Sequence, residues 1–329
     1  MVDVNSRENR YAILTLMDIH IAVDIGGTHM RAATYHSDSI SPINISRITT
    51  QHSGTSPLAR LEELISSVWP EGQPVKGIAV AAPGPLDPYR GIIYEAPNIP
   101  QWINLPLKDL LQTRFLVPVE VGNDANLAAL GEWKYGAGVG HHYLVFLTVS
   151  TGIGGGVIVD DRLLMGSRGL AAELGHINVM TEGPLCGCGQ RGHLEAVASG
   201  TAIAHWVEQQ LSERAESSLK AFTNITALHV SEAANRGDQL AIDALHRAGN
   251  FLGIAIAGFL HIFNPTVVII GGGVSRSGDT LLEPMRAAIQ QHVMTPQYIE
   301  NLTITTATLG DDAGLLGALA LARSPQTPG

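Results

Sequence analysis

One pattern constrains the fold of this chain more than any other, because it occurs twice: a buried strand, a glycine-rich tip and a second strand. The first copy places strands at 19–24 and 30–35 on either side of Gly26-Gly27-Thr28. The second copy places strands at 143–149 and 155–159 around a segment, 150–156, that contains four glycines. Apolar, strand-forming residues around a short glycine turn are typical of hairpins. The pattern therefore predicts a sheet in each half of the chain.

Strands and helices alternate elsewhere. Buried strands are predicted at 75–81, 117–121, 266–270 and 303–307, and helices at 124–135, 200–211, 230–237, 239–261, 279–291 and 312–323. Residues 166–200 are rich in Gly, Cys, His and Glu and lack clear periodicity, which predicts a long functional loop region. The alternation predicts an α/β protein. Its 329 residues, 45% of them apolar, suffice for two cores with a boundary near 125–140.

Charge and hydropathy exclude several classes of protein. The formal net charge is −10, and no cluster of Lys or Arg forms a basic stripe, so we expect neither a nucleic-acid partner nor a membrane partner. The most apolar stretch, 251–270, is interrupted by His261, Asn264 and Pro265, and the N-terminus lacks the apolar run of a signal peptide. We therefore expect a soluble, cytoplasmic protein.

Three glycine-rich loops suit an anion. Asp24-Ile25-Gly26-Gly27-Thr28 can point backbone N–H groups at a phosphate, although an ordinary glycine hairpin uses the same residues. The second loop, 150–156, contains a GxG but joins two strands, so it is not a dinucleotide fingerprint, and the chain has no Walker sequence. The third, Gly271-Gly272-Gly273, ends a strand, where ligands of α/β sheets bind. Together they predict ATP binding, with Asp24 holding Mg²⁺ through water.

Asn123-Asp124-Ala125-Asn126 joins a predicted strand to a predicted helix. Asn and Asp are favoured as helix N-caps, which is the structural interpretation of this segment. An aspartate at the end of a sheet strand can also act as a general base opposite a bound phosphate. Both interpretations are compatible, because a helix N-terminus stabilises an ionised carboxylate.

Two thiols and two imidazoles fall within eighteen positions: His176, Cys186, Cys188 and His193. Cysteines one residue apart are poorly placed for a disulfide. Thiolate and imidazole are the preferred ligands of tetrahedral Zn²⁺, and four protein ligands indicate a closed, structural site. We therefore predict structural zinc in preference to unliganded thiols.

Glu173 and Glu195 flank this segment among small and apolar neighbours. They are either solvent-exposed loop acids or acceptors for the hydroxyl groups of a polyol. Carboxylates positioned beside a metal favour the second interpretation, with a sugar as the substrate.

The sequence resembles the ROK family of sugar kinases, which have the hexokinase and actin-like ATPase fold, a ribonuclease H-like α/β architecture. The similarity extends over about residues 18–323, and the segments that carry it are 23–28, 82–86, 123–126, 148–156, 173–176, 186–195 and 269–275. The resemblance implies two domains with a cleft between them. We expect residues 18–125 plus 311–325 in the smaller domain and residues 126–310, with the zinc loop, in the larger one.

The resemblance also implies a role for each motif. Asp124 is implied as the catalytic base. The implied sugar-binding residues are Gly84, Asn123, Asp124, Glu173, His176 and Glu195, of which His176 also ligates zinc together with Cys186, Cys188 and His193. The implied ATP-binding residues are Asp24, Gly26, Gly27, Thr28, Thr151, Gly152, Gly154, Gly155, Gly272 and Gly273.

Three positions depart from the family pattern. His193 stands where the last zinc ligand is usually cysteine, Ala172 stands where the residue before the glutamate is usually glycine, and Ser150 stands where glycine is frequent. His193 is still a competent ligand and makes the predicted site Cys₂His₂.

The implied activity is ATP-dependent phosphorylation of a hexose at its 6-hydroxyl, and Glu173, typical of glucose-using members, favours glucose. N-acetylmannosamine, N-acetylglucosamine, fructose and allose are the alternative sugars. The family also contains sugar-responsive repressors, which place a DNA-binding module of about 60–80 residues before the kinase-like part. Only 18 residues precede the strand at Ile19, which favours the kinase. Members are often dimers or tetramers, so we expect a homo-oligomer.

Overall fold

The computed structural model describes residues 18–324 and contains two five-stranded mixed sheets. The first has the order β3-β2-β1-β4-β8, in which β1 (Ile19–Ile25) pairs antiparallel with β2 (His29–His36) and parallel with β4 (Val75–Ala82). β3 (Asn44–Thr49) and β8 (Val119–Asn123) form its edges. The segment before β1, in which we expected no DNA-binding module, lies outside the described residues.

The second sheet repeats this layout in the order β11-β10-β9-β12-β13. Here β9 (Tyr143–Val149) pairs antiparallel with β10 (Ile153–Val159) and parallel with β12 (Val267–Gly271). β11 (Arg162–Leu163) and β13 (Thr303–Thr306) are the edges. Both predicted hairpins are therefore confirmed, and each forms the antiparallel part of its sheet.

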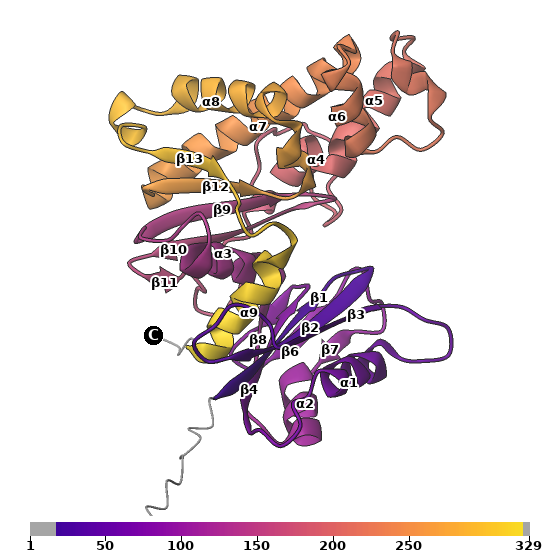
Figure 1. Ribbon diagram of the computed structural model, residues 1–329. Helices are drawn as coiled ribbons and strands as arrows, with labels where there is room; N and C mark the ends of the chain where they lie inside the picture. The colour runs from indigo at the N-terminus through magenta and orange to yellow at the C-terminus, as the bar shows by residue number, and fades with distance from the viewer. Residues whose placement is uncertain (1–17, 325–329) are drawn as a thin grey trace, which may run out of the picture.

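Helices cover the outer faces of the two sheets (Figure 1). The first sheet packs on α1 (Pro57–Ser67) and α2 (Leu107–Phe115) through one apolar cluster, and a small sheet of β5 (Leu86–Asp87), β6 (Ile92–Glu95) and β7 (Ile103–Leu105) lies beside them. The second sheet packs on a larger helical layer through a second apolar cluster. That layer contains α4 (Leu194–Ala198), α5 (Gly200–Ser212), α6 (Ala227–Asn235), α7 (Gln239–Phe263) and α8 (Asp279–His292).

Two helices lie between the sheets: α3 (Asp124–Tyr135), which follows β8, and α9 (Ala313–Arg323), which crosses the middle of Figure 1. A third apolar cluster joins them to both sheets. The helices approach closely at two glycines. A Cβ on Gly317 would lie 1.7 Å from the carbonyl oxygen of Leu127, and one on Gly131 would lie 2.4 Å from that of Ala313. No larger residue fits at this crossing.

Several boundaries differ from those predicted. The strand expected at 117–121 runs from Val119 to Asn123, because Pro118 has no N–H to donate to a strand ladder. The helix expected from residue 230 begins at Ala227, where the Thr226 hydroxyl caps it by accepting from the backbone N–H of His229. The region 166–200 is mainly irregular, but it contains the 3₁₀ turn Leu174–His176 and the short helix α4. Leu194 and Val197 of α4 are buried, which explains why the segment is ordered as a helix.

No helix within residues 18–324 is long and apolar enough to cross a membrane.

Candidate active site

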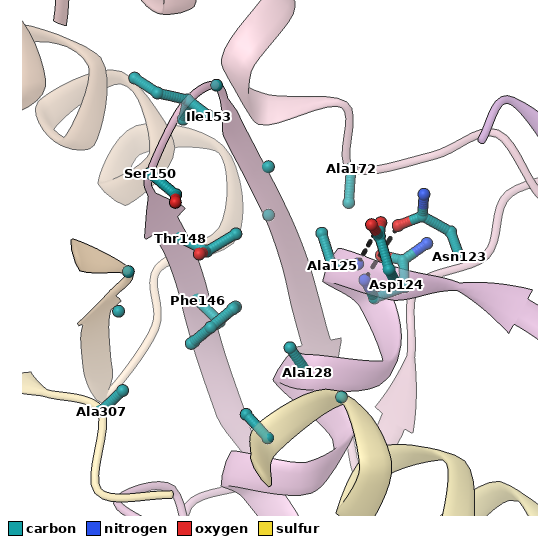
Figure 2. A pocket seen from close by; sticks show the side chains of 18 of the residues that line it. Asn123, Asp124, Ala125, Ala128, Phe146, Thr148, Ser150, Ile153, Ala172 and Ala307 are labelled. Atoms are coloured by element: carbon teal, nitrogen blue, oxygen red, sulfur yellow. Dashed lines mark hydrogen bonds between the residues drawn. The ribbon is translucent and has the colours of Figure 1, made fainter. Parts of the chain in front are cut away.

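A cavity of about 1290 Å³ opens between the two sheets. Its walls come from the ends of β1, β4 and β8, the β9–β10 loop, residues 170–176, the end of β12 and the loop after β13. Figure 2 shows Asn123 and Asp124, at the start of α3, across the cavity from Thr148 and Ser150 of the β9 hairpin. Residues from both halves of the chain therefore face one space.

Asp124 is the first residue of α3, and Asn123 is its N-cap. The Asn123 side chain accepts from the backbone N–H of Asn126 at 3.0 Å, while Asp124 Oδ1 accepts from the N–H of Ala125 at 2.8 Å. Desolvation in the cavity wall raises the pKa of Asp124 to about 6, and the negative charges of Asp24 and Glu173 add to the rise. A carboxyl group with a pKa near 6 is suited to accept a proton at neutral pH. The capping role thus belongs to Asn123, which leaves Asp124 to the cavity.

The predicted sugar residues come together on one side of the cavity. Gly84, Asn123, Asp124, Glu173, His176 and Glu195 all line it. Loss of water around its carboxyl raises the pKa of Glu173, an effect that His176 opposes and Glu195 reinforces. Glu195 sits on α4, and its Oε2 accepts from the backbone N–H of Ile153 at 2.8 Å. Glu195 therefore also fixes the tip of the second hairpin.

The predicted ATP residues divide into two groups. Asp24, Gly152, Gly154, Gly155, Gly272 and Gly273 line the cavity. The other four predicted ATP residues do not line it: Gly26, Gly27, Thr28 and Thr151. The backbone carbonyl oxygen of Thr151 accepts a hydrogen bond from the Thr201 hydroxyl at 2.9 Å. Thr148 and Ser150 line the cavity in its place. Gly272 has φ +83°, and a Cβ there would lie 2.2 Å from the Val149 carbonyl oxygen, so this turn requires glycine.

Arg31 is a residue that the sequence reasoning missed. Its guanidinium donates to Asp24 Oδ2 at 2.7 Å and to Asp312 Oδ1 at 3.0 Å, and it also bonds the Asp311 carbonyl oxygen. It therefore ties the first glycine hairpin to the segment that leads into α9. The predicted first hairpin was the available signal, since its register places Arg31 opposite Asp24.

The loop after β13 was missed as well. Five residues line the cavity beside the glycines 271–273: Thr306, which ends β13, and Ala307, Thr308, Gly310 and Asp311, which follow it. Asn98, in the loop between β6 and β7 of the small sheet, also lines the cavity. None of these residues belongs to a motif with local spacing, so only the folded chain brings them to the site.

The four predicted metal ligands meet at the cavity wall. One ligand atom from each of His176, Cys186, Cys188 and His193 lies within 4.8 Å of the others. Cys186 Sγ is 3.6 Å from His176 Nδ1, and Cys188 Sγ is 3.2 Å from His193 Nδ1. A tetrahedral zinc separates sulfur and nitrogen ligands by about 3.6 Å, so the donor set and its spacing fit Zn²⁺. Burial raises the pKa of the Cys186 thiol to about 11, and a cation is what would hold it as a thiolate at neutral pH.

The ROK family matches residues 20–324. The chain belongs to that family. This ROK chain is 39% identical over 306 residues to a glucokinase of Thermotoga maritima, an alignment that covers 92% of this chain and 96% of that one. It superimposes with a TM-score of 0.78 and 35% identity on a ROK glucokinase of Streptomyces griseus in complex with glucose and AMPPNP, covering 93% and 99% of the two chains. The fold is that of the actin-like ATPases and hexokinases.

The ROK chain is also similar to a repressor. It is 34% identical over 250 residues to the xylose repressor of Caldicellulosiruptor bescii, which corresponds to 75% of this chain and 62% of the repressor. The glucokinases match over nearly their whole length and the repressor does not.

Proposed function

We propose that this chain is a glucokinase, which transfers the γ-phosphoryl group of ATP to the 6-hydroxyl of glucose. One observation carries the proposal: Asp124, with its pKa near 6, faces a cavity that also contains glycine-rich loops and a second carboxylate, Glu173. Similarity to glucokinases over more than nine-tenths of the chain supports the same reaction.

The reaction requires a hydroxyl, a base and a phosphoryl group in line. In our proposal four side chains form hydrogen bonds with the sugar hydroxyls and place the 6-hydroxyl beside Asp124. They are those of Asn123, Glu173, His176 and Glu195. Asp124, ionised at neutral pH, accepts the proton as the oxygen attacks the γ-phosphorus. The bond from that phosphorus to the leaving oxygen of ADP then breaks.

In our proposal the glycine-rich loops attract the negatively charged phosphates of ATP. In a chain of net charge −10, the attraction for a polyanion must come from local dipoles. We assign this role to backbone N–H groups of the β9–β10 loop and of the turn after β12. Mg²⁺, when bound with ATP, neutralises phosphate charge, and Asp24 Oδ1 is the acceptor we assign to its water shell, because Oδ2 already bonds Arg31.

Zinc is the second ion in the proposal. His176, Cys186, Cys188 and His193 would hold it, and a closed site of four protein ligands contributes folding free energy. Cys186 Sγ lies 3.6 Å from Glu195 Oε1, so a metal held by Cys186 would also restrain Glu195. Glu195 in turn holds the tip of the second hairpin through its bond to the backbone N–H of Ile153.

Domain division and assembly are further parts of the proposal. Packing of α9 against the first sheet supports a smaller domain of residues 18–125 plus 311–325 and a larger one of residues 126–310. A dimer or tetramer remains a prediction, which light scattering on the purified protein checks.

A hexose panel tests the function. Purified chain is incubated with ATP·Mg²⁺ and glucose, N-acetylmannosamine, N-acetylglucosamine, fructose or allose, and ADP release and the sugar phosphate are measured. We expect the highest kcat/KM with glucose and phosphate on the 6-oxygen. Absence of sugar-dependent ADP release, together with salt-sensitive DNA binding, would establish the repressor alternative.

A further inference from the structure

Glu132 is a carboxylate that the proposed mechanism does not use. It lies on α3, eight residues after Asp124, and its side chain is completely buried, at 0% exposure. It does not line the cavity. Burial of an ionised carboxylate is costly unless hydrogen bonds compensate for the lost water.

Donors from two segments supply that compensation. Glu132 Oε1 accepts from the backbone N–H of Leu309 at 2.8 Å. Oε2 accepts from the backbone N–H of Ala137 at 2.9 Å and from the Thr308 hydroxyl at 3.2 Å. The Ala137 bond secures the end of α3, whereas the other two secure the loop that follows β13.

That loop forms one wall of the active-site cavity. Thr308 itself lines the cavity, as do Ala307 and Gly310 on either side of the bonded pair. The wall lies beside the glycine triplet of β12, to which β13 is paired. It therefore belongs to the part of the cavity that we assign to the nucleotide, and Figure 2 shows Ala307 of this wall on the opposite side of the view from Ala172, the neighbour of Glu173.

There is little freedom around the carboxylate. A Cβ on Gly136 would lie 2.1 Å from Glu132 Oε2 and 3.0 Å from Leu309 Cγ. The carboxylate thus fills the space between the end of α3 and the loop, and both of its oxygens are engaged.

We propose that Glu132 is a positioning residue for the nucleotide. It fixes the loop 306–310 to the helix whose first residue is the catalytic base. Asp124 and Glu132 are separated by about 12 Å along that helix, the rise of eight residues. One rigid element consequently sets both the base and the wall against which ATP binds, and this inference rests on the proposed function.

The test is Glu132→Gln, which keeps the size of the side chain but replaces one acceptor oxygen with a donor that faces other donors. We expect KM and Kd for ATP to rise about tenfold and kcat to fall several-fold, with the Kd of glucose unchanged. Kinetics and calorimetry with ATP and with glucose are measured well below the melting temperature of the variant.

Two further variants make the result specific. Gly136→Ala keeps the charge but displaces the carboxylate, so the same selective loss of ATP affinity is expected, even where Glu132→Gln fails to fold. Glu120→Gln is the matched control, because Glu120 on β8 is a partly buried carboxylate paired with Lys108 at 3.0 Å outside this cavity. We expect it to change neither Kd.

Other outcomes overturn the inference. Equal changes in ATP and glucose affinity, or a lower melting temperature with both affinities retained, would leave Glu132 a purely structural residue. A wild-type chain that binds ATP but phosphorylates no hexose contradicts the proposed function only, and the ATP affinities of the variants then still decide the role of Glu132. A wild-type chain that binds no ATP overturns both.

Discussion

The two sheets share one strand order but present different chemistry to the cavity between them. The first sheet brings carboxylates to the carboxyl ends of its strands, Asp24 near the end of β1 and Asp124 directly after β8, and Arg31 restrains Asp24. The β9 and β12 ends of the second sheet bring glycines and the hydroxyls of Thr148 and Ser150. In our proposal the same topology supports two roles. The carboxyl ends of the first sheet, here called the charged edge, supply the base for proton transfer, and those of the second sheet, the glycine edge, supply backbone dipoles for phosphate.

Removal of the base tests the charged edge, and we expect the largest effect there. Asp124→Asn should lower kcat by about 10²–10⁴-fold, the usual contribution of a general base, while glucose binding stays measurable. Steady-state kinetics and glucose calorimetry check this. Asp161→Asn, at an exposed aspartate paired with His142, is the control and should retain full activity. A fully active Asp124→Asn enzyme refutes the assignment.

The melting temperature of the same variant tests the raised pKa of Asp124. The pKa of Asp124 is raised in the folded chain to about 6 from an ordinary value of 3.8, so folding favours the protonated form. The stabilising contribution of protonation is present below pH 3.8 and is lost as pH rises through 6. Asp124→Asn should therefore melt at a higher temperature than wild type at pH 8, and the difference should shrink at acid pH. An unchanged difference across that range contradicts the shifted pKa.

The cluster of His176, Cys186, Cys188 and His193 has no counterpart among the described residues of the first half. We expect the second-largest effect from disrupting it. His193→Ala should reduce zinc content from about one ion per chain, lower the melting temperature and raise the KM for glucose about tenfold or more. Elemental analysis, thermal melts and kinetics measure these effects. His205→Ala, at an exposed histidine on α5, is the matched control. Wild-type protein purified without zinc, and unaffected by added zinc, would contradict a structural metal.

Acidification tests the role of Asp124 as the base without a mutation. Because Asp124 must be ionised to accept a proton, kcat/KM should fall as pH drops through about 6 and reach roughly a tenth of its plateau at pH 5. A pH–rate profile measures this limb. A profile that is flat from pH 8 to pH 5 would show that the base titrates elsewhere.

The glycine edge should respond least. A Cβ on Gly154 would lie 2.7 Å from the Cβ of Ala125, next to Asp124. Gly154→Ala should therefore push the second hairpin away from the start of α3 and raise the KM for ATP about five-fold, which corresponds to about 1 kcal/mol of overpacking. Gly140→Ala, where a Cβ meets nothing within 4 Å but φ is +85°, separates backbone strain from crowding. Equal effects of the two substitutions would contradict the packing argument.

The sequence was most informative where one segment contained the whole signal. The paired hairpins and the buried strand at 75–81 were predicted from their apolar runs, and the clustering of His176, Cys186, Cys188 and His193 was predicted from their spacing. The helices α1 and α2 were missed. α2 begins after Pro106 without a side-chain cap, so the usual start signal of a helix is absent. β3 alternates between exposed and half-buried residues and therefore lacks the apolar run of a buried strand.

The site was predictable only in part, for a related reason. Asp124, Glu173 and the glycines of the second hairpin lie in local motifs, and all line the cavity. Arg31, Asn98 and the loop 306–310 acquire their positions through tertiary contacts, which no local spacing encodes. Within the predicted phosphate loop 150–156, Ser150 lines the cavity and Thr151 does not, a distinction that the sequence did not predict. Which residues at the end of a strand point inward depends on the register of the hairpin, and the sequence alone does not give that register.

The glycine crossing of α3 and α9 has a mechanical consequence. The chain passes from the first sheet to the second through α3, and α9 packs back against the first sheet. At Gly131 and Gly317 the backbones of these two helices meet without side chains between them. A rotation of one sheet against the other about this point would change the width of the cavity mouth and would leave the packing of the two helices in place. A methyl group at either glycine would force the two helix backbones apart, and neither glycine lines the cavity, so such a variant would disturb the relation between the sheets without contacting a bound molecule.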